Sequence, residues 1–306
     1  MSQITEQRHL PPGTLAPPPA SARQRRARLR RLVTRLASHT LLIAGSIIIM
    51  IPIGWMLSTS FKKTGQEWIF PPIWIPDPIW WQNYIEAMYA LPIPFYVYVL
   101  NTVVITITAT LGTVLTSALA AFAFARLRFP ARQFMFLLVI STMMLPSAVT
   151  LIPKFIIFRH LNWLDTFLPL IVPFWLGGTA FSIFLLRQFF MTIPRELDEA
   201  ARMDGASSFQ IFWWVVLPLS GPALATVIIF QIWSHWNDFI DPLIYINSSS
   251  KYTIALALRT FQNVRSQRVN YLMAMSVIQV LPIVILFLGA QKYFIRGIHL
   301  SGLSGR

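Results

Sequence analysis

Six long apolar runs constrain the fold of this 306-residue chain more than any other feature. A helix of about 20 apolar residues can cross the roughly 30 Å hydrocarbon core of a bilayer, and only helices or closed barrels satisfy their backbone groups there. The sequence therefore predicts an all-α membrane protein with six transmembrane helices. The runs cover about residues 39–61, 95–125, 133–153, 167–188, 219–246 and 271–291.

The composition agrees with a membrane protein, since 55% of residues are hydrophobic, 12% are charged and the mean hydropathy is +0.59. A formal net charge of +14 could indicate nucleic-acid binding. The basic residues, however, lie mainly in an N-terminal cluster and at the ends of apolar runs, which is typical of membrane topology. We expect a lipid bilayer around the chain and no nucleic acid. The chain has no cysteine, which excludes disulfides and thiolate chemistry.

The positions of lysine and arginine predict the orientation. An even number of spans places both termini on one side, and most of the 25 Lys and Arg residues fall on that side. The positive-inside rule then predicts cytosolic termini. Residues 1–38 are rich in proline and arginine, and we expect a disordered basic cytosolic extension there. Residues 39–306 would form the six-span domain, with an uncleaved first span because no cleavage site follows it.

A charged stretch, residues 194–218, separates the fourth and fifth runs and is cytosolic in this orientation. Pro194 fits the first position of a helix, and Gly205 fits the left-handed residue that follows a helix end. A stripe of small or apolar residues recurs at helical spacing: Leu197, Ala200 and Ala201. Opposite charges four residues apart support the same helix: Arg195 with Glu199, and Asp198 with Arg202.

A second short helix is predicted directly after Gly205. Ser207 and Gln210 have the spacing of a capping box, in which each side chain bonds the other residue's backbone amide. Pro218 should interrupt the helix or redirect the chain. One apolar face is expected on this helix: Phe209, Phe212, Trp213 and Val216. Residues 194–218 therefore predict two short helices that meet at a glycine corner.

Polar residues inside the spans are candidates for a translocation path, because unpaired polar groups in lipid are costly. Hydrogen bonding to neighbouring helices is the alternative explanation. The fifth run is the most polar, with His235, Asp238 and Asp241 in its outer half, which must face protein, a water-filled cavity or the outer interface. The path candidates are Asn101, Ser141, Gln231, Asn237, Asp238 and Gln279.

Patterns for catalysis or cofactor binding are missing from the sequence. No glycine is followed by lysine, so there is no Walker A loop for a nucleotide. The five histidines form no H-E-x-x-H pair, and there is no G-x-S-x-G elbow. We expect a chain that is not an enzyme and that binds no cofactor or metal itself.

The stretch EAARMDGASSFQIFWWVVLP, residues 199–218, closely resembles the EAA motif of permease subunits in binding-protein-dependent ABC importers. Three further segments strengthen the resemblance: FPPIWIPDP after the first run, WNDF at 236–239, and QKYFIRGIHLSGLSGR at the C-terminus. Together they are similar to the carbohydrate branch, the maltose- and glycerol-phosphate-type permeases with six spans. The similarity covers about residue 39 to the end.

The resemblance implies a bacterial-type inner-membrane permease for a sugar or sugar-like solute. Its implied partners are a second, homologous permease, two cytosolic ATPase subunits that carry ATP and Mg, and an external solute-binding protein. The ATPases would dock on residues 194–218, so that ATP-driven closure moves the membrane helices. The docking residues implied here are Glu199, Ala200, Ala201, Arg202, Asp204, Gly205 and Phe209.

Two alternatives stay open at this point. The first keeps the family and changes the solute to phosphate, an amino acid or a peptide. The second is an ion-coupled secondary transporter that uses His235, Asp238 or Asp241 and needs no ATPase. The sequence identifies neither the solute nor the residues that contact it.

Overall fold

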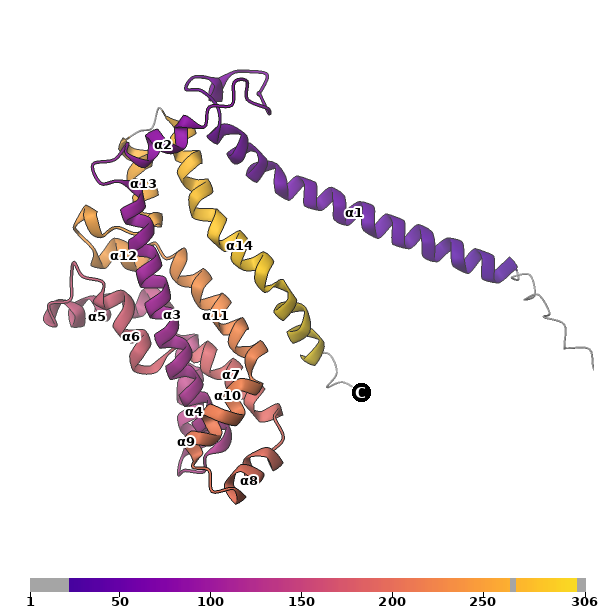
Figure 1. Ribbon diagram of the computed structural model, residues 1–306, viewed down its shortest axis with the longest axis vertical. Coiled ribbons are helices and arrows are strands. Elements are labelled where there is room, and N and C mark those ends of the chain that lie inside the picture. The colour runs from indigo at the N-terminus through magenta and orange to yellow at the C-terminus, as the bar shows by residue number, and fades with distance from the viewer. Residues whose placement is uncertain (1–21, 265–267, 302–306) are drawn as a thin grey trace, which may run out of the picture. The chain divides into compact units, whose positions relative to one another are not determined.

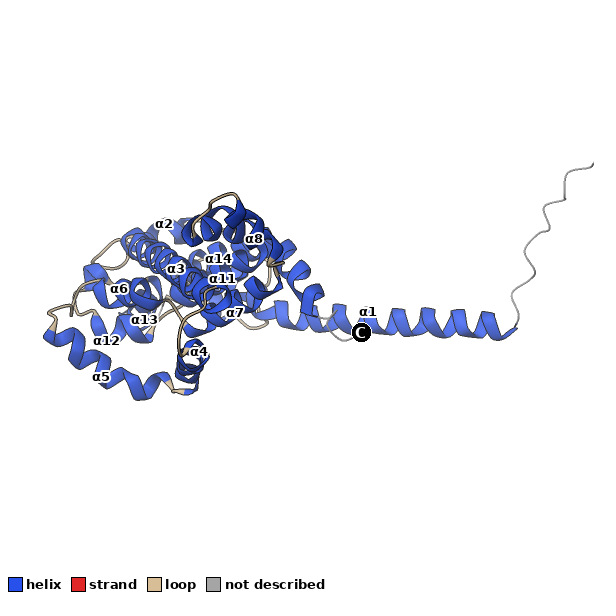
Figure 2. Ribbon diagram, turned by 90° about the horizontal axis from the view of Figure 1, so that it is seen from below, coloured by secondary structure: helices blue, strands red, loops and turns tan. Residues whose placement is uncertain are grey.

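The computed structural model describes residues 22–264 and 268–301. All regular secondary structure in these residues is helical (Figure 2). The α-helices are α1 Ala22–Ser60, α2 Gln82–Met88, α3 Phe95–Arg126, α4 Arg132–Ser141, α5 Ser147–His160, α6 Leu168–Gly177, α7 Ala180–Thr192, α8 Glu196–Met203, α9 Ser208–Ile211, α10 Leu217–Leu219, α11 Gly221–Trp236, α12 Ile240–Tyr245, α13 Ile254–Val264 and α14 Val269–Ser301. Short 3₁₀ turns occupy Gln66–Trp68, Thr142–Met144 and Ser249–Lys251, and a π-helix occupies Phe212–Val216.

Four helical segments are long and apolar enough to cross a membrane: Arg30–Ser60, Phe95–Arg126, Leu168–Thr192 and Val269–Gln291. Two further helix pairs qualify only if each bent pair counts as one span. These pairs bend by 101° between residues 132–144 and 147–160, and by 81° between residues 208–219 and 221–236. The described chain is therefore an all-helical membrane protein with four to six candidate spans.

The chain divides into two compact parts, Met1–Gly54 and Trp55–Arg306. The described portion of the first part is the helix α1 from Ala22 onward. The expected disordered extension 1–38 is therefore wrong for residues 22–38, where alanine, arginine and leucine are strong helix formers. Residues 1–21 lie outside the described residues. Large apolar side chains of α1 from Leu32 to Ile53 are exposed, as expected for a lipid-facing helix.

Two predicted spans differ in detail from the helices observed. The third run breaks at Pro146, which caps α5, and α5 continues to His160. The fifth run is not one helix, because α11 ends at Trp236 and α12 starts only at Ile240. Asparagine and aspartate, which follow Trp236, favour helix ends over helix interiors. The polar outer half of this run therefore forms a turn and a second short helix.

The helix α3 is the centre of the second part and packs against α6, α7 and α11. It runs from the end that holds α2 and α13 to the end that holds α8 and α9 (Figure 1). One apolar cluster lies toward α8 and joins Phe122 of α3 to Leu186, Phe190 and Phe212. Another lies toward α2 and joins Phe95 of α3 to Trp236, Phe261 and Met275. The two ends of this part are thus connected by one continuous helix.

Small residues allow the close packing around α3. Gly112 lies against the ring of Trp175, where a Cβ atom would come within 2.5 Å of ring carbon Cδ1. Gly178, in the break between α6 and α7, has φ +63° and ψ −146°, a conformation available almost only to glycine. A Cβ atom on Gly178 would lie 2.0 Å from the hydroxyl oxygen of Ser117. The break between α6 and α7 is therefore built into the fold.

Candidate functional site: a charged corner and a polar cavity

Residues 194–218 form a sharp corner between α8 and α9. Gly205 adopts φ +83°, as expected for the residue after a helix end. Its amide donates to the carbonyl of Arg202 at 3.0 Å, and the amide of Ala206 donates to the carbonyl of Ala201 at 2.9 Å. These two bonds form a Schellman motif, which satisfies the last carbonyls of α8. The predicted glycine corner is confirmed.

The capping box at the start of α9 is also confirmed. The amide of Gln210 donates to the hydroxyl of Ser207 at 3.3 Å, and the amide of Ser207 donates to the side-chain oxygen of Gln210 at 2.8 Å. The corner therefore has hydrogen-bonded helix ends on both sides of Gly205, and a partner can bind it without ordering a loop.

The charged side of α8 differs from the sequence prediction. The helix begins at Glu196, so Pro194 lies before it and is not its first residue. Asp198 pairs with Arg126 of α3 and not with Arg202, because the side chain of Asp198 is buried against the end of α3. No ion pair joins Arg195 to Glu199 in the residues that the structure describes. Sequence spacing predicts ion pairs within one helix only. Here the partner of Asp198 comes from another helix, α3.

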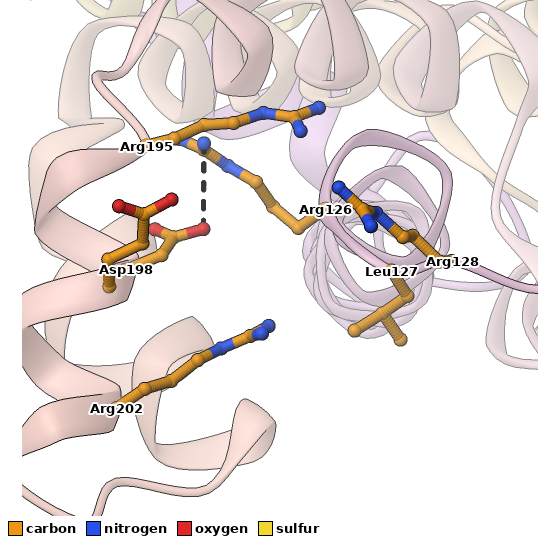
Figure 3. Close-up of a pocket in the computed structure, with 7 residues that line it drawn as sticks. Arg126, Leu127, Arg128, Arg195, Asp198 and Arg202 are labelled. Carbon is orange, nitrogen blue, oxygen red and sulfur yellow. Dashed lines mark ion pairs between the residues drawn. The ribbon is translucent and has the colours of Figure 1, made fainter.

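Arg126 ties the corner to the membrane helices. Its Nη1 atom lies 3.5 Å from Oδ2 of Asp198 (Figure 3). Its Nη2 atom donates to the carbonyl of Ile193 at 2.8 Å. The guanidinium groups of Arg128, Arg195 and Arg202 surround the same pocket of about 290 Å³ (Figure 3). Glu199 also lines it. The pocket is therefore predominantly basic and is anchored on α3.

The implied docking residues are mostly exposed at this corner. Glu199, Ala200, Arg202, Asp204, Gly205 and Phe209 are exposed, and Ala201 is half-buried. Leu197 is also exposed, so the predicted stripe of Leu197, Ala200 and Ala201 does not pack as a unit inside this chain. Only Ala201 touches the apolar cluster beneath the corner. The exposed side of α8 and α9 is available to another protein.

The predicted apolar face after Ser207 is divided. Phe212 and Val216 are buried, whereas Phe209 and Trp213 are exposed. The physical reason is the π-helix Phe212–Val216, whose wider turn departs from the helical period on which the prediction rested. The chain then bends by 81° into α11, in agreement with the redirection expected near Pro218.

A polar cavity of about 760 Å³ lies between α5, the break between α6 and α7, and the helices α11 and α12 with the turn that joins them. The polar side chains that line it come from separated parts of the sequence: Ser147, Lys154, Thr179, Gln231, Ser234, His235, Asp238, Asp241 and Tyr245. Lys154 and Thr179 were not among the predicted path residues, since nothing near them in the sequence marks them. They line the same cavity as Asp238, from α5 and from the break between α6 and α7.

Gln231 joins the cavity to three helices. It is buried, and its Nε2 atom donates to the hydroxyls of Thr179 at 3.3 Å and Ser182 at 3.1 Å. The amide of Thr179 donates to the hydroxyl of Ser117 on α3 at 3.3 Å. We call this set of Ser117, Thr179, Ser182 and Gln231 the polar knot. It links α3, α7 and α11 beside the cavity.

The structure brings only Gln231 and Asp238 of the six path candidates into this cavity. Asn101 donates to the carbonyls of Ser250 and Tyr252 and so holds a loop. The other three make hydrogen bonds within or between helices. The Ser141 hydroxyl donates to the backbone carbonyl of Leu138, and the Asn237 side-chain amide donates to that of Trp233. The backbone carbonyl of Gln279 accepts from Trp236 Nε1.

A separate clasp joins the turn before α6 to the turn after α12. Asp165 Oδ1 accepts the amides of Asn247 at 3.0 Å and Ser248 at 2.8 Å, and Oδ2 accepts the Ser248 hydroxyl at 2.6 Å. The Lys251 ammonium lies 3.1 Å from Oδ2. These hydrogen bonds hold the pKa of Asp165 well below its usual range, and the two bonds from Ser248 have the largest effect. The clasp therefore depends on the ionised carboxylate.

Metal binding finds no support within residues 22–264 and 268–301, where no three His, Cys, Asp or Glu side chains are grouped closely enough to hold an ion.

Breaks in apolar helices, a polar cavity among them and a preorganised charged corner define a membrane transport protein. The chain belongs to the family described as "Binding-protein-dependent transport system inner membrane component", which matches residues 112–300. It is thus a multi-pass inner-membrane permease of a binding-protein-dependent importer. The resemblance stated from the EAA-like stretch is confirmed.

Similar proteins agree with this assignment. The chain is 34% identical over 266 residues to the sn-glycerol-3-phosphate transport system permease protein UgpE of Yersinia pestis, covering 85% of this chain and 94% of the relative. It is 33% identical over 263 residues to the probable ABC transporter permease protein YurM of Bacillus subtilis, covering 85% of each. A crystal structure of a bacterial ABC transporter involved in the import of the acidic polysaccharide alginate shares the fold, with a TM-score of 0.76 at 24% identity over 86% of this chain and 96% of that one.

Proposed function

We propose that this permease is driven by ATP hydrolysis in two separate ATPase subunits that dock on residues 194–218. The observation that carries this proposal is the corner itself: its helix ends are hydrogen-bonded internally, while Glu199, Met203 and Phe209 stay exposed. An exposed carboxylate and two large apolar side chains on a rigid support are suited to a protein partner. ATP and Mg would bind to the partner and not to this chain.

The proposed topology has six spans and cytosolic termini. Each bent helix pair then counts as one span, and the corner lies on the cytosolic side, where the ATPases would be. The excess of lysine and arginine on that side supports this orientation. Residues 1–38 would be a basic cytosolic extension that is helical from Ala22.

A path for mechanical coupling runs from the corner to the cavity. Arg126 anchors α8 to the end of α3, and α7 leads from the corner to the polar knot. Closure of the ATPase pair would move α8, and α3 and α7 would carry that movement to the helices around the cavity. A second, homologous permease would complete the translocation path, and an external binding protein would deliver the solute.

The proposed cargo is a sugar or sugar-like solute. The name of the relative UgpE specifies a phosphorylated glycerol, and that relative matches over most of its length. Import of phosphate, an amino acid or a peptide is the alternative within the family. The solute retained by the external binding protein that co-purifies with this chain would separate these cargoes, and a bound amino acid or peptide would overturn the sugar proposal.

Coupling is tested in proteoliposomes that contain the assembled importer. Glu199→Ala and Gly205→Pro should each reduce uptake per ATP hydrolysed, because the first removes an exposed docking carboxylate and the second cannot adopt φ +83°. Glu196→Ala is the matched control, since it removes an exposed carboxylate of α8 that is not an implied docking residue. Unchanged coupling in both test variants would show that the ATPase docks elsewhere.

A second candidate function, ion-coupled secondary transport, is favoured by one observation: His235, Asp238 and Asp241 line one cavity with Lys154. Such a transporter would work without an ATPase. Uptake by the purified chain alone, driven by a proton gradient and lost in Asp238→Asn, would favour it over the ATP-driven importer.

A further inference from the structure

The polar cavity contains hydrogen-bonding groups that this chain leaves unused. His235 is only 8% exposed, and its Nε2 atom is buried with no hydrogen-bond partner among the described residues. Tyr245 is 2% exposed, and its hydroxyl is likewise buried without a partner there. Both residues line the cavity. Buried polar groups are ordinarily paired, so these two indicate a ligand that itself carries hydrogen-bonding groups.

The charges that line the cavity do not suit an anion. Asp238 and Asp241 face it together with one cation, Lys154. No ion pair joins Lys154 to either carboxylate within the described part of the chain. With both carboxylates ionised, two negative charges face one positive charge and the cavity is net negative. There is then no positive surplus for a phosphate or carboxylate group.

The remaining lining supplies apolar ring faces. Phe174 and Phe181 line the cavity, and the Phe174 ring stands edge-on to the His235 imidazole at a centroid distance of 4.5 Å. A sugar ring presents C–H faces to such aromatic surfaces, while its hydroxyls donate to carboxylates. Small-molecule sites typically combine an apolar lining with a few directed polar groups.

We propose that this cavity takes a polyhydroxylated solute without negative charge, a neutral sugar, polyol or amino sugar, and rejects its phosphorylated or uronic acid counterparts. Asp238 and Asp241 accept the hydroxyl or ammonium donors of the solute and repel anions. This inference rests on the proposed import of a sugar-like solute and names its charge class.

The absence of cysteine allows a direct measurement of the cavity's electrostatics. Ser234 lines the cavity, so Ser234→Cys places a single thiol of this chain there. The full-length protein, with the subunits that co-purify with it, is placed in nanodiscs of zwitterionic lipid. It is then treated with methanethiosulfonate reagents that carry a trimethylammonium or a sulfonate group, and labelling of this chain is followed by intact mass. The ratio of the two rates is divided by the same ratio for 2-mercaptoethanol in solution.

The normalised ratio should favour the cationic reagent by about tenfold or more, because a cleft with one sign of charge concentrates ions of opposite charge. Asp238→Asn with Asp241→Asn should bring the ratio toward one, and Lys154→Gln should raise it further. A ratio of one or below in the Ser234→Cys protein, or a shift of the Lys154→Gln ratio toward the anionic reagent, overturns the proposal.

A second measurement concerns the solute class. Glucose and glucosamine should slow the labelling of Ser234→Cys by the uncharged methyl reagent, whereas glucuronate at equal concentration should not. Glycerol compared with glycerol 3-phosphate gives a second pair that differs in charge. Equal protection by the anions overturns the proposal, and so does an absence of protection by all the uncharged and cationic compounds. Neither ATP nor a binding protein is needed, so failure here is distinct from failure of ATP coupling.

Discussion

Arg126, the last residue of α3, forms an ion pair with Asp198 in the first turn of α8, with Nη1 3.5 Å from Oδ2 (Figure 3). Both side chains are nearly buried, at 2% and 10% exposure. The pair attaches the corner to α3, the central helix of the second part. Two residues 72 positions apart in the sequence thus hold α8 against the end of α3.

Asp198→Asn should weaken this attachment, because it leaves the Arg126 guanidinium buried beside a neutral group. Removal of one partner of a buried pair costs about 3 kcal/mol, and the remaining bond from Arg126 to Ile193 would limit the loss. We expect lower thermal stability of the assembled importer and lower uptake per ATP. Glu196→Gln is the control, since Glu196 is exposed on α8 and is not an implied docking residue, and its loss should change stability by about 0.5 kcal/mol or less. Equal effects of both variants would contradict a special role of the pair.

Gly178→Ala should disrupt the break between α6 and α7. The substitution forces a side chain into a backbone conformation that costs about 1–3 kcal/mol and directs it at the Ser117 hydroxyl. The yield of folded protein and its unfolding temperature, measured in detergent, should both fall. Gly177→Ala is a closely matched control, because Gly177 ends α6 and its added methyl group would meet nothing within 4 Å. If both alanine variants behaved alike, the break would not be a fixed element of the fold.

The sequence predicted the parts of this fold that depend on local pattern. Apolar runs located the membrane helices, and the Gly205 corner and the Ser207 capping box followed from residue type and spacing. The sequence could not predict that Asp198 pairs with Arg126. Both Arg202 and Arg126 are plausible partners, and only tertiary packing decides between them. The π-helix at 212–216 likewise has no period that a sequence pattern reveals.

The cavity was only partly predictable for a related reason. Gln231 and Asp238 were noticed as polar residues in an apolar run. Lys154 lies at the end of the third apolar run, where lysine is common. Thr179 is a small residue of the kind that often packs between membrane helices. They line one cavity with Asp238 because the chain breaks at Pro146, before α5, and at Gly178, between α6 and α7.

Gln231→Leu should loosen the polar knot while it keeps a similar volume. It removes the donors to Thr179 and Ser182, and hydrogen bonds between membrane helices are worth about 1 kcal/mol each. We expect a modest loss of stability and a larger loss of uptake per ATP, since the knot joins α7 to α11 beside the cavity. Ser234→Ala removes a polar group that lines the same cavity from an exposed position and should affect stability less. Full coupling in Gln231→Leu would argue against transmission through the knot.

The Asp165 clasp should open when its carboxylate is protonated. Its pKa is lower in the folded chain than the ordinary value of about 3.9, so ionised Asp165 stabilises the clasp at every pH above that value. The stabilisation should decline as the pH falls below about 4 toward the lower pKa of the folded chain.

Hydrogen exchange at the amides of Asn247 and Ser248, which donate to Asp165, measures this loss of stabilisation directly. After correction for the intrinsic pH dependence of exchange, these two amides should exchange slowly from pH 8 to about pH 4.5 and faster below that range. Asp165→Asn should exchange rapidly throughout, and a protected Ser248 amide in this variant would show that the backbone alone holds the two turns together.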